Sequence, residues 1–200
     1  FVGKRGHGKS TLLRVLGGVL IPESGDFFVP PHLRVYHIEH HPVFFQTDLL
    51  ENLVYGVKND EDGRVERVFS ICRRFGISES ILQNITSKEI HDWESFLSLT
   101  QKTTLHLARA IIANPEVLVL HKPTLCFDTD MSLRVLGIFK EFVKERGLEN
   151  QGNVRFRRRR TCMMTTTRKE GLNLMDQIIV ISKDGASNVA VSDLAVDLLD

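Results

Sequence analysis

The chain has 200 residues, of which 42% are hydrophobic and 26% charged, and its formal net charge at pH 7 is +1. These values are typical of a soluble globular chain that can bury a substantial core. Its longest apolar runs, such as VLVL and IIVI, are far shorter than the roughly 20 residues that span a bilayer, which excludes a membrane helix within these residues.

The first half of the chain predicts a strand end, a glycine turn and a helix. The turn is GKRGHGKST, residues 3–11. Apolar residues then recur at helical spacing up to Leu20, and PESG at residues 22–25 ends the pattern. Residues 33–42 alternate like a half-buried strand that Pro42 closes. Helix formers dominate residues 48–85, with a polar break at 59–63.

The second half predicts helices that alternate with short apolar strands. We expect a helix over residues 101–113, ended by Asn114 and Pro115, and then VLVL as a buried strand. A second helix is expected over about 130–145, followed by strands at 161–165 and 178–181 and a turn at 183–185. This alternation predicts an α/β fold with a mostly parallel sheet flanked by helices.

The glycine turn has the spacing of a phosphate-binding loop. Gly3, four residues, Gly8, Lys9 and Ser10 satisfy GxxxxGK[ST] between a strand end and a helix. Glycines let backbone N–H groups point at phosphate oxygens, the lysine reaches the outer phosphates, and the serine hydroxyl is the candidate Mg²⁺ ligand. The predicted nucleotide-binding residues are Gly3, Gly6, Gly8, Lys9, Ser10 and Thr11.

In this order and spacing, several motifs resemble the nucleotide-binding domain of ATP-binding cassette (ABC) proteins, most closely the exporter type. They are PESG, HPVFFQTDLLENLVYG (41–56), LSLTQKTTLHLARAIIANPEVLVL (97–120) and KPTLCFD (122–128). The resemblance covers residues 3 to about 185. It implies a P-loop NTPase core, at about 1–46 and 105–200, with an inserted helical subdomain at about 47–104. The family's N-terminal β-layer, with the aromatic residue that stacks on adenine, would precede Phe1.

The resemblance also shows which family residues are replaced. The family's metal-orienting glutamine aligns with His40, its strand-end aspartate and glutamate with His121 and Lys122, and its switch histidine with Thr167. Asp128, at the end of the following loop, is retained. The signature loop, which in the family has two glycines after Leu-Ser, is Leu97, Ser98, Leu99, Thr100 and Gln101.

These replacements predict binding without turnover. Phosphoryl transfer needs Mg²⁺ and a group that positions water, and the exchange at His121 and Lys122 moves the formal local charge from −2 to about +1 when the histidine is neutral. We therefore expect ATP to bind with weakened dependence on Mg²⁺ and with weak or absent hydrolysis. The resemblance implies a second cassette as head-to-tail partner, a transmembrane domain, and a place on the cytosolic face of a membrane.

A cluster of arginines leaves an alternative open. Arg155 and residues 157–160 form a basic run that can grip nucleic acid or anionic lipid, although a solvated loop is the simpler interpretation. The alternative function is a soluble, non-transport ABC-type protein that binds nucleic acid through this run. The exporter-like stretch at 41–56 favours transport and makes nucleic acid the less favoured partner. A third alternative is a relic fragment without a stable fold.

Overall fold

The computed structural model describes residues 1–193 and divides the chain into two compact units. The first, here called the sheet unit, comprises Phe1–His40, Glu116–Lys140 and the chain from Thr161 onward. The second, here called the helical unit, comprises His41–Pro115 and Glu141–Arg160. Within residues 1–193, no helix is both long enough and apolar enough to cross a membrane.

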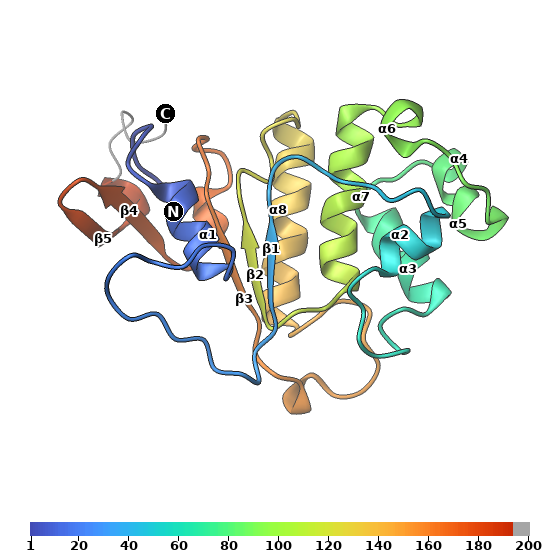
Figure 1. Cartoon of the computed structure of the whole chain (residues 1–200), viewed down its shortest axis with the longest axis horizontal. Helices are drawn as coiled ribbons and strands as arrows, with labels where there is room; N and C mark the ends of the chain where they lie inside the picture. Colours follow the sequence, from blue (N-terminus) through green and yellow to red (C-terminus); the bar gives the residue numbers. More distant parts are fainter. Residues whose placement is uncertain (194–200) are drawn as a thin grey trace. The chain divides into compact units, whose positions relative to one another are not determined.

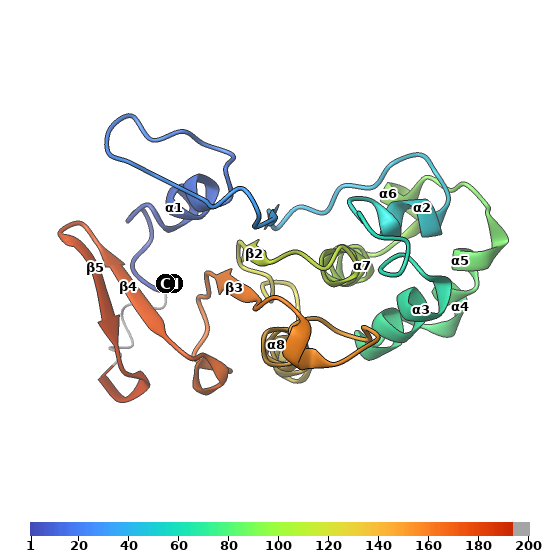
Figure 2. The ribbon, with the colours of Figure 1, turned by 90° about the horizontal axis from the view of Figure 1, so that it is seen from below.

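A parallel sheet forms the centre of the sheet unit. Strands β1 (Val35–Ile38), β2 (Val117–Leu120) and β3 (Thr161–Met164) lie side by side in the order β1-β2-β3, with Val35 opposite Val117 and Val117 opposite Thr161 (Figures 1 and 2). Leu118, Val119 and Leu120 are fully buried, as expected for a strand of a parallel sheet covered on both faces. The predicted α/β fold with a parallel sheet is confirmed.

The first two residues extend this sheet. The Thr166 amide donates to the Phe1 carbonyl over 3.3 Å, and the Val2 amide donates to the Ile179 carbonyl over 3.0 Å. Strand β4 (Ile178–Ser182) then turns back as β5 (Gly185–Val189) in an antiparallel hairpin. Phe1 and Val2 therefore act as the predicted strand end, between β3 and β4.

Helix α1 (Lys9–Leu16) follows the glycine turn and packs against β2. It ends earlier than the apolar pattern up to Leu20 predicts. Gly17 follows it, where a Cβ would collide with the His37 ring, and Gly18 has φ +70°, a left-handed conformation that suits glycine. The sheet unit also contains two short 3₁₀ helices, η2 (Leu172–Leu174) and η3 (Val191–Asp193). Helix α8 (Thr129–Lys144) passes from the sheet unit into the helical unit after Lys140.

Helix α7 (Leu99–Ile112) is the centre of the helical unit. It packs against α2 (Leu49–Val54) and α3 (Val65–Arg74), as Figures 1 and 2 show. The unit also contains α4 (Glu79–Leu82), α5 (Asn84–Ser87), α6 (Trp93–Phe96) and a 3₁₀ helix, η1 (Val154–Phe156). Helix α7 begins two residues before the predicted start because Ser98 and Gln101 form a reciprocal capping box.

A buried amide organises the segment that leads into α2. Asn52 has no exposed surface; its Oδ1 accepts the Phe45 amide over 2.8 Å, and its Nδ2 donates to the Phe45 carbonyl over 3.0 Å. Arg109, from α7, donates to the Val43 carbonyl over 2.9 Å and stacks over the Phe44 ring at 4.9 Å. The backbone of 43–52 is thereby held by side chains that the periodicity of the sequence does not distinguish.

Candidate nucleotide site

The phosphate loop has the backbone conformation that its glycines predict. Gly3, Gly6 and Gly8 have φ values of +146°, +84° and +81°, a region that side chains strongly disfavour. At Gly3 a Cβ would also collide with the Ile181 carbonyl oxygen, because β4 runs directly alongside. These glycines permit a tight turn whose amides lead into the N-terminus of α1, a favourable position for an anion.

The Lys9 ammonium lies folded across this turn. It donates to the Gly3 carbonyl and, over 2.8 Å, to the Lys4 carbonyl, and the residue is only 8% exposed. Its pKa is lowered, first by burial and second by the positive charge of Lys122. Lys9 is therefore a desolvated cation with a second cation nearby. Ser10 and Thr11, the next residues of α1, are partly exposed and exposed.

Two basic residues, His121 and Lys122, directly follow β2. Lys122 has φ +48°, a strained conformation for a residue with a Cβ, and its amide donates to Thr165 Oγ1 over 3.0 Å. His121 Nδ1 lies 3.0 Å from the same oxygen, and the His121 amide donates to the Ile38 carbonyl. Thr165 is completely buried, so one hydroxyl just after β3 fixes both residues that follow β2.

Burial keeps His121 neutral. Its pKa is lowered mainly by desolvation; Glu39 opposes the shift, while Lys122, His40 and His37 add to it. The His40 ring, at the end of β1, lies edge-on to His121 with ring centroids 5.8 Å apart. Because neutral imidazole carries no charge, the formal positive charge at this strand end comes from Lys122. The positions predicted as His40, His121 and Lys122 are thus brought together.

The other predicted strand-end residue, Thr167, is not the residue that contacts this group. Thr165 makes those contacts, and Arg168 makes another set: its guanidinium donates to the Phe127 carbonyl over 2.7 Å and to Ser132 Oγ over 3.2 Å. Sequence reasoning missed Thr165 and Arg168. The available signal was their position directly after a buried strand, but three consecutive threonines gave no means of choosing among them.

Asp128 caps the N-terminus of α8. Its Oδ1 accepts the Met131 amide over 2.8 Å, and its carbonyl accepts the Ser132 amide, which is the geometry of a helix N-cap at α8. Arg168 holds the carbonyls just before it. The loop from His121 to Asp128 is therefore anchored at both ends by the segment that follows β3.

The predicted signature loop lies in the helical unit, at the start of α7. Leu97 is buried, Ser98 Oγ accepts the Gln101 amide over 3.3 Å, and Gln101 Oε1 accepts the Ser98 amide over 2.9 Å. Leu99 and Thr100 occupy the first helical turn and are exposed. Neither has a positive φ, so what distinguishes these positions from glycine is side-chain bulk rather than backbone conformation.

The residues present fit a nucleotide better than they fit a metal. Loop amides, the α1 N-terminus and Lys9 suit a polyphosphate. Mg²⁺ prefers oxygen ligands, usually carboxylates together with phosphates, and the strand end next to Lys9 offers imidazole and ammonium instead. The one magnesium ligand that the sequence predicts is the Ser10 hydroxyl, and among the described residues no cluster of three or more histidine, cysteine or acidic side chains could hold a metal ion.

Comparisons with known proteins agree on one family. Residues 1–125 match the family model described as ABC transporter. Antigen peptide transporter 2 of Rattus norvegicus is 30% identical over 141 residues, which are 64% of this chain and 20% of that protein. The aliphatic sulfonates import ATP-binding protein SsuB 2 of Paraburkholderia xenovorans (strain LB400) is 28% identical over 180 residues, 90% of this chain and 64% of that protein.

A solved structure supports the fold. A metal-chelate type ABC transporter in an inward-facing conformation aligns with a TM-score of 0.67 at 18% identity, covering 97% of this chain and 73% of that one. The chain spans about a fifth of the length of the rat transporter. The relatives thus include an import ATP-binding protein as well as an antigen peptide transporter, so they support an ABC transporter cassette and do not distinguish exporter from importer.

Proposed function

The chain belongs to the ABC transporter family, and from that premise we propose that it is the degenerate ATP-binding cassette of a larger transporter of exporter type. It holds ATP with weak dependence on Mg²⁺ and hydrolyses it weakly or not at all. The observation that carries the proposal is the pair of basic residues, His121 and Lys122, directly after β2, with Lys122 close enough to lower the pKa of Lys9.

Electrostatics supports binding. Two ammonium groups that repel each other gain from a shared polyanion, because each then acquires a charge-assisted hydrogen-bond acceptor in a partly desolvated site. In this proposal Lys122 supplies part of the positive charge that the metal supplies in a competent site. The same charge opposes entry of a free divalent cation, so the nucleotide binds without requiring one.

Loss of turnover follows from the same residues. Hydrolysis needs a group that positions the attacking water and a metal that neutralises developing charge. Neutral His121 and cationic Lys122 perform neither role as a carboxylate would. Thr167, at the switch position, offers only a hydroxyl. A loss of about 4 kcal/mol of transition-state stabilisation slows a reaction about a thousandfold.

Two surfaces of the helical unit support the proposed partners. A second cassette would meet the start of α7, where exposed Leu99 and Thr100 add bulk beside the Ser98 cap. This bulk makes the chain the degenerate member of a head-to-tail pair. A transmembrane domain has an apolar docking surface in Val43, Phe45 and Tyr55, which are 59%, 40% and 56% exposed. Membrane association on the cytosolic face follows from that partner.

We also propose the domain division, in which a helical subdomain at about 47–104 is inserted in the core.

Nucleotide titration tests the proposal. A fluorescent ATP analogue is titrated with Mg²⁺ and with EDTA, using wild type, Lys9→Ala, Lys122→Ala and the exposed-lysine control Lys183→Ala. We expect the wild-type Kd to change less than about threefold without metal, and the Lys9 and Lys122 variants to bind at least about tenfold more weakly in EDTA. Strict Mg²⁺ dependence would contradict the proposal, as would rapid phosphate release, far above that of Lys9→Ala.

A gain-of-function variant sharpens the same test. The double variant His121→Asp, Lys122→Glu restores two carboxylates at the end of β2. It should make analogue binding Mg²⁺-dependent, because two acids beside a triphosphate repel it unless a cation intervenes. If the double variant binds equally well with and without metal, the charge at this strand end does not govern the site.

A further inference from the structure

The arginine run forms an ordered loop within the helical unit. Asn153 Oδ1 accepts the Arg155 amide over 2.9 Å, and the 3₁₀ turn η1 follows. The Arg146 guanidinium donates to the carbonyls of Arg155 and Arg157 over 3.2 and 3.0 Å. The turn that contains the run is thus fixed at its start by Asn153, and the Arg146 side chain binds two of its carbonyls.

Arg157 belongs to the support rather than to the exposed surface. Its guanidinium donates to the carbonyls of Glu145, Asn150 and Gly152 over 3.1, 2.6 and 2.7 Å. Arg160 donates to Asn114 Oδ1 over 3.3 Å. Arg157 and Arg160 therefore stabilise the fold, which an interpretation of the sequence as one uniform basic patch does not predict.

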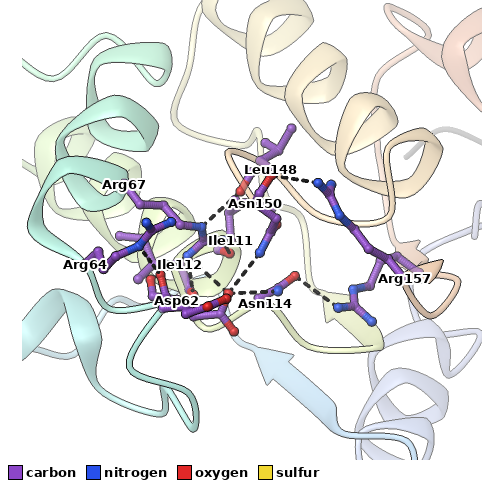
Figure 3. Close-up of polar contacts among 11 residues, drawn as sticks. Asp62, Arg64, Arg67, Ile111, Ile112, Asn114, Leu148, Asn150 and Arg157 are labelled. Atoms are coloured by element: carbon purple, nitrogen blue, oxygen red, sulfur yellow. Dashed lines mark hydrogen bonds and ion pairs between the residues drawn. The ribbon is translucent and has the colours of Figure 1, made fainter. Parts of the chain in front are cut away.

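A buried carboxylate anchors the same loop from the other side. Asp62 Oδ1 accepts Nδ2 of Asn114 and Nδ2 of Asn150, each over 3.0 Å, and lies 3.8 Å from an Arg67 nitrogen (Figure 3). Arg67 also donates to the Leu148 carbonyl over 3.0 Å. Because Asn150 both donates to Asp62 and accepts from Arg157, the loop is tied to the buried network at the C-terminal end of α7.

Four side chains remain exposed on this supported turn: those of Arg155, Phe156, Arg158 and Arg159. Phe156 is 87% exposed and has basic residues on both sides in the sequence. The turn is ordered and presents this apolar side chain among arginines. It contains no acidic residue between positions 153 and 160. It therefore combines an apolar insertion element with a concentrated positive charge.

We propose that this turn is a binding site for an anionic phospholipid surface, with Phe156 entering the boundary between headgroups and acyl chains and Arg155, Arg158 and Arg159 contacting lipid phosphates. The inference rests on the proposed function, because a transmembrane partner brings the chain to a membrane. Guanidinium groups bind phosphate oxygens bidentately, and apolar side chains on basic elements insert shallowly at such interfaces.

The composition of the turn favours lipid over nucleic acid. Proteins that hold single strands line a groove with successive aromatic side chains, one for each stacked base. This turn presents a single aromatic residue, Phe156, which suffices for shallow insertion. Each basic residue near an anionic leaflet contributes about fivefold in partitioning, so three contribute roughly a hundredfold. Such binding is weak alone and gains from tethering to a membrane partner.

Vesicle flotation of the full chain tests the site. Phosphatidylcholine vesicles are compared with vesicles containing about one-third phosphatidylserine, a composition that supplies the negative surface. The charge variant is Arg155→Gln, Arg158→Gln, Arg159→Gln, and its matched control is Lys58→Gln, Lys144→Gln, Lys183→Gln, three exposed lysines elsewhere. The apolar variant is Phe156→Ser, matched by Phe28→Ser, which is 78% exposed in the sheet unit.

We expect wild type to bind only the anionic vesicles, the charge variant to lose about a hundredfold, and Phe156→Ser to lose about tenfold. The control variants should bind as wild type does. Equal binding by the charge variant and its control would overturn the proposal. So would tighter binding of oligouridine RNA than of anionic vesicles with losses in the same variants, because the partner would then be nucleic acid.

The same samples separate this proposal from that for the nucleotide site. All loop variants should bind the ATP analogue in solution as wild type does, and Lys9→Ala should bind vesicles as wild type does. Loss of vesicle binding in Lys9→Ala would overturn the independence of the loop. Circular dichroism of each variant, unchanged from wild type, assigns a lost interaction to the turn rather than to unfolding.

Discussion

The two units each bury a positive charge, but they satisfy it differently. In the helical unit the Arg67 guanidinium donates to the carbonyls of Asp62, Ile111 and Ile112, over 2.6, 3.2 and 2.9 Å, besides its bond to Leu148. In the sheet unit Lys9 donates to the Gly3 and Lys4 carbonyls, and within residues 1–193 its principal charged neighbour is another cation, Lys122. The first arrangement is complete within the fold, whereas the second still favours an added anion.

This difference separates a structural cation, Arg67, from Lys9, the cation of the proposed nucleotide site. Burial lowers the pKa of Arg67 to about 10, and Asp62 partly opposes that shift, so the group stays charged at neutral pH with its donors occupied. The pKa of Lys9 is lowered by burial and by the positive charge of Lys122, and no acid among the described residues opposes that shift. A desolvated cation without a counter-ion costs free energy, and a ligand phosphate would remove that cost.

The largest expected effect comes from breaking the complete arrangement. Arg67→Met leaves the buried Asp62 carboxylate without its cation and several α7 carbonyls without a donor. We expect a loss of about 4 kcal/mol in the free energy of unfolding, measured by urea denaturation. The exposed Arg73→Met on the same helix is the control and should unfold at the wild-type midpoint. A wild-type midpoint for Arg67→Met would show that the network contributes nothing.

A smaller effect is expected from the strand end of the sheet unit. Thr165→Val keeps the shape of the side chain but removes the acceptor for the Lys122 amide and the partner of His121. The predicted loss is about 2 kcal/mol, because buried polar groups then lack a hydrogen bond. Thr161→Val, at the exposed start of β3, is the matched control. If both variants unfold alike in urea, Thr165 does not anchor this loop.

The smallest predicted effect is a pH dependence from α7. Burial lowers the pKa of His106 to about 4, with a second contribution from the charge of Arg109, and its Nδ1 has no hydrogen-bond partner in the described chain. In the unfolded chain His106 has a pKa of about 6.5, so between pH 6.5 and pH 4 it binds a proton that it does not bind in the folded chain. Stability is therefore fully present above pH 6.5 and decreases as pH falls toward 4.

This contribution amounts to about 1.8 kcal/mol between pH 7 and pH 5 for a largely buried imidazole. Urea denaturation at several pH values measures it, and His106→Gln should flatten the curve by that amount. His41→Gln, an exposed histidine, is the control and should leave the slope unchanged. An unaltered slope in His106→Gln would mean that the acid sensitivity of the chain arises elsewhere.

The sequence predicted the parts of the site that depend on local spacing. Gly3 and Gly8 predict a turn because glycine adopts positive φ values at little steric cost. Both residues have a positive φ in the structure. The short apolar strands and the long helices were also predicted, with ends displaced by a few residues where caps and glycines intervene. The end of α1 differs from the prediction because the close approach of Gly17 to His37 joins residues far apart in the chain.

Local patterns did not identify the residues that complete the site. Thr165 and Arg168 act on an earlier loop: the contact of Thr165 with His121 spans 44 residues of the chain, and that of Arg168 with Phe127 spans 41. Likewise, the sequence does not distinguish Arg157 from the other four arginines of the run. Its three carbonyl acceptors in the structure show its structural role. Such roles depend on which carbonyls the fold brings within reach.

By itself the sequence determined the element order, the phosphate turn and the basic pair His121 and Lys122, since these are properties of neighbouring residues. Only the tertiary structure decided which charges are satisfied. Backbone oxygens accept hydrogen bonds from all three cations, Arg67, Arg157 and Lys9. However, Arg67 has a nearby carboxylate in Asp62, whereas Lys9 has the positive charge of Lys122 as a neighbour. The physical reason is that hydrogen bonding and desolvation depend on distances through space, which packing sets and spacing along the chain does not.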